Sequence, residues 1–470
     1  MLMLTTTAFQ DSRISFWPRV REIAVPPSMI GTATARRRAG DWAGACAAAG
    51  FDVDLDLRTV ARVHGSDLAA RLRADLRRLA PDLLRWHMPR TAPDGLLRTG
   101  TTLTLARYDE PGHPRPVRLV VRTAPAWAEG GQRISLTVWD GLAPHGHGYG
   151  PSGYRPPDRR FRLDLHRHLW DADRSHELRP RTGADGPLDG PVPPWASSVP
   201  GPQRFALGRW ADEAALLLAA EGRTGGGEVA VRLGGRHRLL LEVRPLPGPS
   251  GEDVGTSEVR TARHVKAGAC AGLPVLPDAA TWALPDLELL RCGLVTPERL
   301  HPLVAAALAP GAEASGSSGV DDHDGPREVD CRGARHRIGL VDGVLVPLDH
   351  DPAEIRREEL LAALTGAPFP CLQVIDAAHR RPDCLADVRD RLAHGDSAGA
   401  LAGIERVLGT EARLRDGDLR DLFTDAARQR VRHGLFRAGL ADPGPREPVA
   451  GRERYRVGVH RSRPRNAAYR

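Results

Sequence analysis

The segment DLAARLRADLRRLAPDLLRWHMPRTAPDGLLRTGTTLTLAR, residues 67–107, contains the change of pattern that decides the fold. In its first half, apolar residues recur every three or four positions with arginines between them, which predicts amphipathic helix over 67–86. In its last six residues, 102–107, apolar and polar residues alternate, which predicts a strand. The chain therefore passes from a helical module into a β module near residue 100.

Three later segments, 117–122, 134–139 and 161–165, alternate in the same way. Together with 102–107 they make four short strands joined by turn-rich segments. Such a series predicts an antiparallel meander with one face on a core.

Two hairpins are predicted further along the chain. Gly234-Gly235 separates the alternating segments 228–233 and 238–243, and Asp342-Gly343 separates 335–341 from 344–348. Glycine pairs and Asp-Gly at such positions favour tight hairpin turns. Helical periodicity marks three further segments: 205–220, 285–309 and 352–434.

Glycine and proline, 50 and 40 residues, collect in a few stretches that we interpret as linkers. We therefore predict a multidomain α+β protein. Its parts are a helical module (1–100), an antiparallel β module (101–180), a small α+β module (205–310), an acidic linker (311–328), a β-hairpin plus helical module (329–440) and a basic disordered tail (441–470).

The composition excludes several chemistries. The chain has 66 basic residues and a net charge of +7, yet Lys266 is its one lysine. Lys266 lies between Val265 and Ala267, so the chain has no phosphate-binding loop of the G-x-x-x-x-G-K-[ST] type and no kinase lysine in its usual setting. We attribute the excess of arginine to a GC-rich bacterial genome rather than to selection for phosphate binding.

The six cysteines contain no C-x-x-C pair, which is typical of buried thiols in a reducing compartment. No run of about 18 apolar residues is present, so we predict no membrane span. The first basic residue is Arg13, after the short apolar run at the N-terminus, which argues against a cleaved signal peptide. We expect a cytoplasmic protein.

Two short segments resemble each other: AGDWAGA at 39–45 and HGDSAGA at 394–400. Glycine followed by aspartate suits the end of one helix and the N-cap of the next. A small residue four positions after the aspartate, Ala45 or Ala400, allows the two helices to pack closely. We interpret each segment as the turn of a helical hairpin.

The strongest candidate for a metal-binding site is Asp164-Leu165-His166-Arg167-His168, at the end of the predicted strand 161–165. Alternation places Asp164, His166 and His168 on one face, where they could bind a divalent metal ion. D-x-H-x-H resembles the first metal motif of amidohydrolases and of polymerase-and-histidinol-phosphatase-like phosphoesterases. That resemblance implies a metal-bound water as nucleophile. The alternative is the polar face of a strand that ends in Leu169-Trp170.

A second candidate is Gly395-Asp396-Ser397-Ala398-Gly399, which matches the nucleophile elbow G-x-S-x-G. It resembles the G-D-S-A-G of hormone-sensitive-lipase-like esterases, with Asp418 and His433 downstream as the acid and base that the resemblance implies. The elbow needs a buried strand before the serine. Residues 387–394 instead have a charged helical pattern, which favours a helix–turn–helix.

A third candidate is a zinc cluster formed from Cys331, His336, Cys371, His379 and Cys384. The spacings C-x₄-H and C-x₇-H-x₄-C match no zinc-finger or zinc-ribbon pattern. We therefore expect ordinary buried thiols here.

The tail 441–470 has a net charge of +5 and includes two tyrosines. Such an arm could contact nucleic-acid phosphates through its arginines, independently of base sequence. The arginines predicted for this role are Arg452, Arg454, Arg456, Arg461, Arg463 and Arg465.

No complete catalytic constellation is visible, and no organic cofactor is predicted. We therefore favour a non-enzymatic interaction or accessory protein that docks on another protein, through its N-terminal helices or the 352–434 region. Such a protein is expected to lack a deep pocket of converging ionisable groups. The alternatives are a metal-dependent hydrolase that uses Asp164, His166 and His168, and an accessory protein that binds nucleic acid through the tail.

Overall fold

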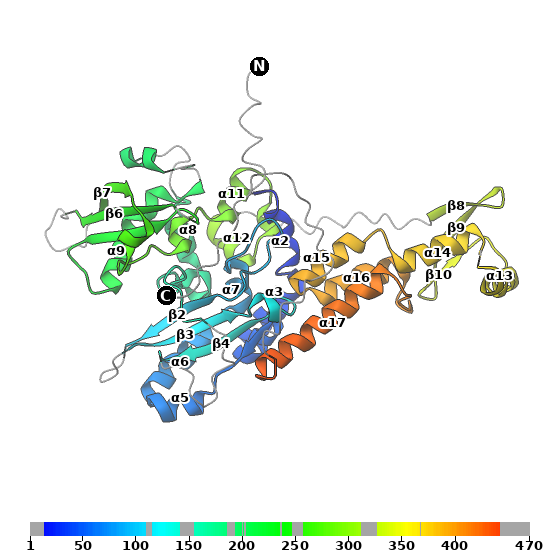
Figure 1. The fold of residues 1–470 in the computed structure, drawn as a ribbon, viewed down its shortest axis with the longest axis horizontal. Helices are drawn as coiled ribbons and strands as arrows, with labels where there is room; N and C mark the ends of the chain where they lie inside the picture. Colours follow the sequence, from blue (N-terminus) through cyan, green and yellow to red (C-terminus); the bar gives the residue numbers. More distant parts are fainter. Residues whose placement is uncertain are drawn as a thin grey trace, which may run out of the picture.

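The computed structural model describes residues 14–109, 115–141, 155–185, 193–199, 201, 204–235, 237–246, 257–311, 327–366 and 368–441. The structure is a multidomain α+β fold, as predicted, with 49% helix, 19% strand and three small separate sheets. Figure 1 shows two of these sheets in a broad body and the third at the end of a projecting arm.

The first core is built on a four-stranded sheet in the order β1-β4-β3-β2. Its strands are β1 (Phe51–Val53), β2 (Thr102–Tyr108), β3 (Val117–Thr123) and β4 (Ile134–Trp139). Strands β2, β3 and β4 form an antiparallel meander, in which Val121 lies opposite Leu103 on one side and Leu136 on the other. Strand β1, which the sequence pattern does not reveal, pairs in parallel with β4.

Helices pack against this sheet and share its core: α2 (Trp17–Ile23), α3 (Pro27–Arg38), α4 (Trp42–Ala48), α5 (Leu57–His64), α6 (Ser66–Arg78) and α7 (Pro81–His87). The helical pattern over 67–86 is present as α6 and α7. The interruption falls before Pro81, which has no backbone N–H to donate and occupies the first position of α7. Leu68, Leu72 and Leu76 are fully buried, so the predicted apolar stripe does face the core.

The fourth predicted strand, 161–165, is wrong. This segment makes a single parallel bridge, from Arg162 to Thr104 of β2, and then turns. The amide of His166 bonds to the carbonyl oxygen of Leu163 at 3.1 Å, a local turn bond that replaces a ladder bond. The chain continues as the short helices η2 (Arg167–Leu169), η3 (Ala172–Glu177) and α8 (Leu178–Thr182).

The second core contains the predicted hairpin, as β5 (Gly227–Arg232) and β6 (Arg238–Pro245), with β7 (Ser257–His264) added beside β6. Helix α9 (Trp210–Ala220) packs on this sheet, and Trp210 donates a hydrogen bond from Nε1 to the carbonyl of Thr281 at 3.1 Å. Thr281 ends the short helix α10 (Asp278–Thr281).

The first hydrophobic core combines residues from several of the predicted modules. Modules 1–100 and 101–180 share the first core, and helices α11 (Pro285–Arg291) and α12 (Pro302–Leu308) return to it. Leu289 and Val304 of these helices are fully buried there. Residues 312–326 of the predicted acidic linker lie outside the described residues.

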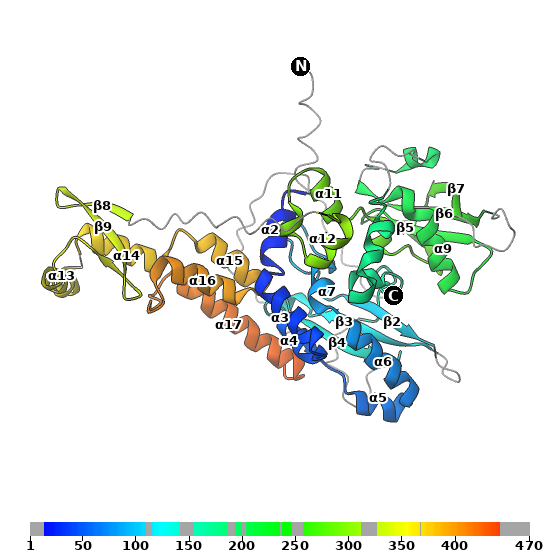
Figure 2. The same cartoon turned by 180° about the vertical axis from the view of Figure 1, so that it is seen from behind.

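The arm begins with a three-stranded sheet of β8 (Arg327–Cys331), β9 (Ala334–Val341) and β10 (Val344–Pro347). Asp342 and Gly343 both have positive φ, 51° and 74°, as the predicted tight turn between β9 and β10 requires. Helix α13 (Pro352–Thr365) follows, and then α14 (Pro370–Arg380), α15 (Leu385–His394), α16 (Ser397–Leu408) and α17 (Asp418–Arg437) lead back to the body (Figures 1 and 2). No helix in the described part of the chain is long and apolar enough to span a membrane.

Both Gly-Asp segments form the predicted helical-hairpin turns. The carboxylate of Asp41 accepts a hydrogen bond from the amide of Gly44, and that of Asp396 accepts one from the amide of Gly399. Ala45 and Ala400 are fully buried. The second turn also docks the arm on the body, because Gly395 lies so close to residue 131 that a Cβ atom would sit 2.2 Å from its carbonyl oxygen.

Arg85 of α7 connects the arm to the body from within the core. Its buried guanidinium donates hydrogen bonds to the carbonyl oxygens of Ala24, Ala49, Gln132 and His394, at 3.0, 3.5, 2.7 and 2.9 Å. These carbonyls follow α2, follow α4, precede β4 and end α15, so one side chain joins four separate segments. Burial lowers the pKa of Arg85 to about 10, which still leaves it charged at neutral pH.

Replacing Arg85 by alanine leaves these buried carbonyls without their donors. We expect the free energy of unfolding to fall by about 3–5 kcal/mol and the α15–α17 helices to become sensitive to protease. Urea unfolding and limited proteolysis measure both effects, with Arg77→Ala, an exposed arginine on α6, as the control. Equal midpoints for the two variants would contradict this role.

Candidate functional site

A cavity of about 510 Å³ lies between the first and second cores. Its wall is formed by α2, the end of α7, the segments 88–98 and 160–169, α9, β5 and the segment 278–285. We refer to it as the interdomain cavity. Deep pockets at such junctions are the usual location of small-molecule sites.

Several aromatic side chains line the interdomain cavity. Trp17, Trp86, Phe161 and Trp282 all line it. The guanidinium of Arg21 lies 4.7 Å from the ring of Trp17 and 4.3 Å from that of Trp86. Such flat, electron-rich surfaces can stack on a planar ligand.

Two histidines that line the cavity have a ring nitrogen without a hydrogen-bond partner in the described part of the chain. Nε2 of His87 and Nδ1 of His168 are buried without a hydrogen-bond partner among the described residues. Burial lowers the pKa of both imidazoles, and the nearby charge of Arg21 lowers that of His87 further. Both rings are therefore neutral at pH 7 and can donate or accept a hydrogen bond.

A carboxylate on α9 organises the next part of the wall. Glu213 accepts two hydrogen bonds from Arg181, at 2.6 and 2.7 Å, and its Oε2 lies 3.0 Å from Nε2 of His166. Burial disfavours its ionised form, but the bonds from His166 and Arg181 lower the pKa of Glu213 to about 2. Glu213 is therefore ionised, and both of its carboxylate oxygens contact Arg181 or His166.

The opposite end of the cavity holds a carboxyl group with a raised pKa. Burial raises the pKa of Asp278 to about 6, an effect only partly offset by Arg160, whose Nη1 lies 3.8 Å away. Arg232 and Arg90 also line the cavity, and the Nε atom of each is buried without a hydrogen-bond partner among the described residues. The two Nη groups of Arg90 donate only to carbonyl oxygens, so its charge has no carboxylate beside it.

Altogether six arginines and two carboxylates line the interdomain cavity: Arg21, Arg90, Arg98, Arg160, Arg181 and Arg232 with Glu213 and Asp278. Arg21, Arg160 and Arg181 each pair with a carboxylate, so the cationic character of the wall comes from the other three arginines. The arrangement can neutralise an anion and stack on a ring at the same time.

The predicted metal ligands Asp164, His166 and His168 lie on the turn that replaces the fourth strand. The carboxylate of Asp164 accepts hydrogen bonds from Nε and Nη2 of Arg162, at 2.9 and 2.8 Å, while His166 faces Glu213. The rings of His166 and His168 are 5.8 Å apart. These three residues do not converge on one point, although two of them line the interdomain cavity, and their metal role stays a prediction.

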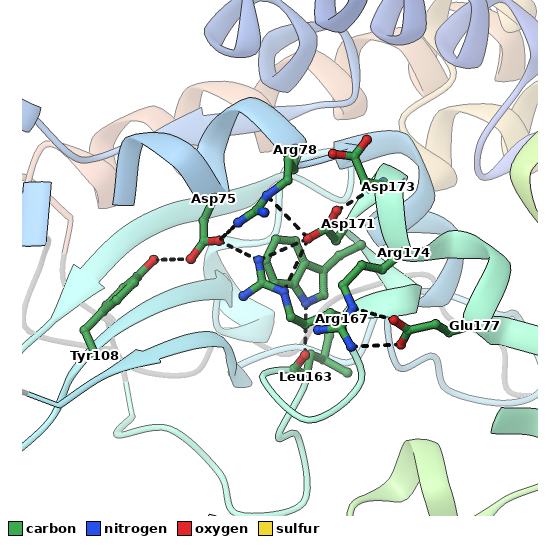
Figure 3. Close-up of polar contacts among 10 residues, drawn as sticks. Asp75, Arg78, Tyr108, Leu163, Arg167, Asp171, Asp173, Arg174 and Glu177 are labelled. Carbon is green, nitrogen blue, oxygen red and sulfur yellow. Dashed lines mark hydrogen bonds and ion pairs between the residues drawn. The ribbon is translucent and has the colours of Figure 1, made fainter. Parts of the chain in front are cut away.

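The residues after this motif are used to hold the body together (Figure 3). Asp75 of α6 accepts hydrogen bonds from Tyr108 at 2.7 Å and from Arg78 at 2.8 Å, and Arg167 bridges it to Asp171. Burial disfavours its ionised form, but these donors lower the pKa of Asp75. Figure 3 shows Arg167 between the two carboxylates, so the segment 167–171 is fixed against α6.

Three residues of the rejected zinc pattern do come together. Ligand atoms of Cys331, His336 and Cys371 lie within 4.8 Å of one another and of a fourth, from His350. His379 and Cys384 are not part of this group. Cys331 and Cys371 are buried free thiols, as expected, but hairpin and helix packing also places them beside two histidines that are distant in sequence.

His350 was missed, although a signal for it was present. In the β9–β10 hairpin Ile338 pairs with Pro347, so His336 faces the position next to His350. The Asp342-Gly343 turn fixes that register from sequence alone.

The serine pattern forms no esterase site. Ser397 begins α16 directly after the helix α15, and no strand precedes it. Asp418 pairs with Arg381, and Nε2 of His433 lies 3.3 Å from the carboxylate of Asp52. The arginines at 452–465 lie outside the described residues, so nucleic-acid contact through them stays a prediction.

Comparison with protein-family models, with curated proteins and with solved structures finds no match to this chain.

The raised pKa of Asp278 predicts that removing its charge stabilises the protein by an amount that depends on pH. Its carboxyl titrates near pH 6 in the folded chain and near 3.8 ordinarily, so its contribution to stability is lost as pH rises from about 4 to about 6. We expect Asp278→Asn to stabilise the protein by roughly 1–3 kcal/mol above pH 6, with the gain vanishing below about pH 4. Urea unfolding across this range measures it.

Asp173→Asn, at an exposed carboxyl on η3, serves as the control and should show no such gain. A gain for Asp278→Asn that is the same at pH 4 and pH 7 would show that charge burial is not its cause.

Proposed function

We propose that this protein binds a small organic anion in the interdomain cavity. The proposal is supported by one observation: four residues that line the cavity, His87, His168, Arg90 and Arg232, each have a buried side-chain nitrogen with no hydrogen-bond partner among the described residues. Leaving such a group unsatisfied costs about 1–3 kcal/mol. Four of them around one cavity are best explained as donors and acceptors kept for a ligand.

Charge and shape define the ligand class. The excess of arginine over carboxylate on the wall favours a carboxylate, sulfonate or phosphate group. The tryptophans and Phe161 favour a flat ring attached to it. A volume of about 510 Å³ is within the range of sites for drug-sized molecules.

Asp278 adds a pH dependence to this binding. Below about pH 6 its carboxyl is neutral, and above it the carboxylate repels a bound anion. Anion affinity should therefore fall as the pH rises through this value.

The aromatic sulfonate 8-anilinonaphthalene-1-sulfonate is a suitable probe, with the uncharged N-phenyl-1-naphthylamine as its comparison. We expect Arg232→Met to weaken binding of the sulfonate by at least about tenfold and to leave the uncharged probe nearly unaffected. Arg244→Met, on the exposed end of β6, is the matched control. Fluorescence titration and calorimetry on the full chain measure both affinities.

Equal sulfonate affinity in the wild type and in the Arg232 and Arg244 variants would contradict the proposal. It would show that the probe binds outside the interdomain cavity or without the help of Arg232. A large loss for both probes in the Arg232 variant would indicate a damaged cavity wall. In that case His168→Gln, which keeps a hydrogen-bonding group, is measured with both probes. A loss of affinity for the sulfonate alone indicates lost recognition, and a loss for both probes indicates damage.

Docking on another protein is the second candidate, because the arm exposes an apolar surface. Seven large apolar side chains near its far end are exposed: Leu340, Val341, Val344, Leu348, Leu360, Leu361 and Leu364. They lie within 25 residues, on the β9–β10 hairpin and α13, and Leu364 is 86% exposed. Clusters of exposed apolar side chains mark interaction sites where they form a continuous patch.

A photo-reactive phenylalanine at Leu361 tests this second candidate. We expect it to form a covalent adduct of one defined mass with a second protein in the native host, because the side chain would lie in the interface. The same group at Glu359, also exposed on α13, is the control. Adducts of the same kind and yield from both positions would indicate random collision rather than docking.

A further inference from the structure

We propose that Cys331, His336, His350 and Cys371 bind one structural zinc ion in the arm. One ligand atom from each of these four side chains lies within 4.8 Å of the other three. No other group of three or more cysteine, histidine or acidic side chains converges in this way within the described ranges. Two sulfurs and two imidazole nitrogens are a ligand set of structural zinc sites.

Separate elements bring the four ligands together. Cys331 ends β8 and is followed by a tight turn at Arg332 and Gly333, both with positive φ. His336 lies on β9, and His350 follows β10 directly before α13. Cys371 is the second residue of α14, so the site would tie the sheet to that helix.

The local geometry suits a tetrahedral ion. Nδ1 of His336 lies 2.5 Å from Nε2 of His350, with the ring centroids 4.2 Å apart, so both nitrogens point to one place. Cys331 and Cys371 are fully buried. Zinc–ligand distances of about 2.0–2.3 Å put neighbouring ligand atoms about 3.3–3.8 Å apart, a small adjustment from this arrangement.

The surrounding residues also match a metal site. Oε2 of Glu354 lies 3.3 Å from Nδ1 of His350, a contact that leaves Nε2 of the same ring for the ion. Glu354 is itself held by Arg332 at 2.8 Å, and the ring of Phe369 packs 4.5 Å from that of His350. A carboxylate behind a ligating histidine orients the ring and increases its basicity.

The small hydrophobic core beside the four ligands gives a physical reason for a stabilising metal ion. The core next to the ligands has five buried residues, Cys331, Ile338, Phe369, Cys371 and Ile375, of which two are the cysteines themselves. An apolar core of this size is too small to hold a module, and such modules commonly use a metal ion instead. Because all four positions are taken by protein, the ion would be structural rather than catalytic.

Metal analysis of the full chain, purified without chelator, tests the proposal. We expect about one zinc per chain in the wild type and a loss of at least about fivefold in Cys371→Ser and in His350→Ala. Cys384→Ser and His379→Ala, from the same part of the arm but outside the four-residue group, are the matched controls and should keep the ion. Equal zinc in all four variants would overturn the assignment.

Two measurements on the wild type keep the test independent of variant folding. X-ray absorption at the zinc edge should give two sulfur and two nitrogen neighbours, and a different ligand count would overturn the proposal. Removing zinc with a chelator should make two further thiols reactive and increase proteolysis within 327–366, and adding zinc back should reverse both. A Cys331–Cys371 disulfide in freshly purified protein that takes up no zinc would equally overturn it.

Discussion

The guanidinium of Arg85 is the contact on which the arrangement of the chain depends. A charge inside a core must be surrounded by acceptors, and here all the acceptors are main-chain carbonyls from four segments. Those segments can satisfy the charge only in one relative position. The helix α7 that presents Arg85 also borders the interdomain cavity through Trp86 and His87. The docking of the arm and the shape of the cavity therefore have a common support.

The arginine-rich composition has a structural use that net charge does not reveal. Arg21 is buried between two indole rings and pairs with Asp286, Arg167 links two carboxylates, and Arg181 clamps Glu213. A planar guanidinium with several donors suits these bidentate and stacked contacts, which an ammonium group would make poorly. Genome composition can explain how many arginines are present, but burial decides which of them shape the cavity wall.

The interdomain cavity and the proposed zinc site belong to different parts of the molecule. Figure 2 shows the β8–β10 sheet at the far end of the arm from the β5–β7 sheet that borders the cavity. The body has two large hydrophobic cores, which can stabilise it without a metal ion. The core beside the proposed zinc ligands has five buried residues. The two proposals thus concern different physical needs: recognition of a ligand in the body and stability of a small module in the arm.

Local pattern was enough to predict much of the fold. The α+β class, the strands β2 to β4, both hairpins and both Gly-Asp turns follow from periodicity, turn chemistry and capping, which act over a few residues. The pattern failed at 161–165, where turn bonds to nearby carbonyls displaced a strand of the same alternating composition. It also missed the short β1, which is recognisable only through its pairing with β4.

Both candidate sites were decided by tertiary structure. The sequence placed His168 beside Asp164 and His166, but only packing shows that Arg162 engages the aspartate and that His168 faces a cavity shared with Arg232 and Asp278. In the same way, Cys331 and Cys371 are forty residues apart and meet because a sheet packs on the start of α14. Sequence determined most of the helices and strands, since those depend on neighbouring residues. Tertiary structure alone decided which side chains meet, because convergence depends on contacts between segments far apart in the chain.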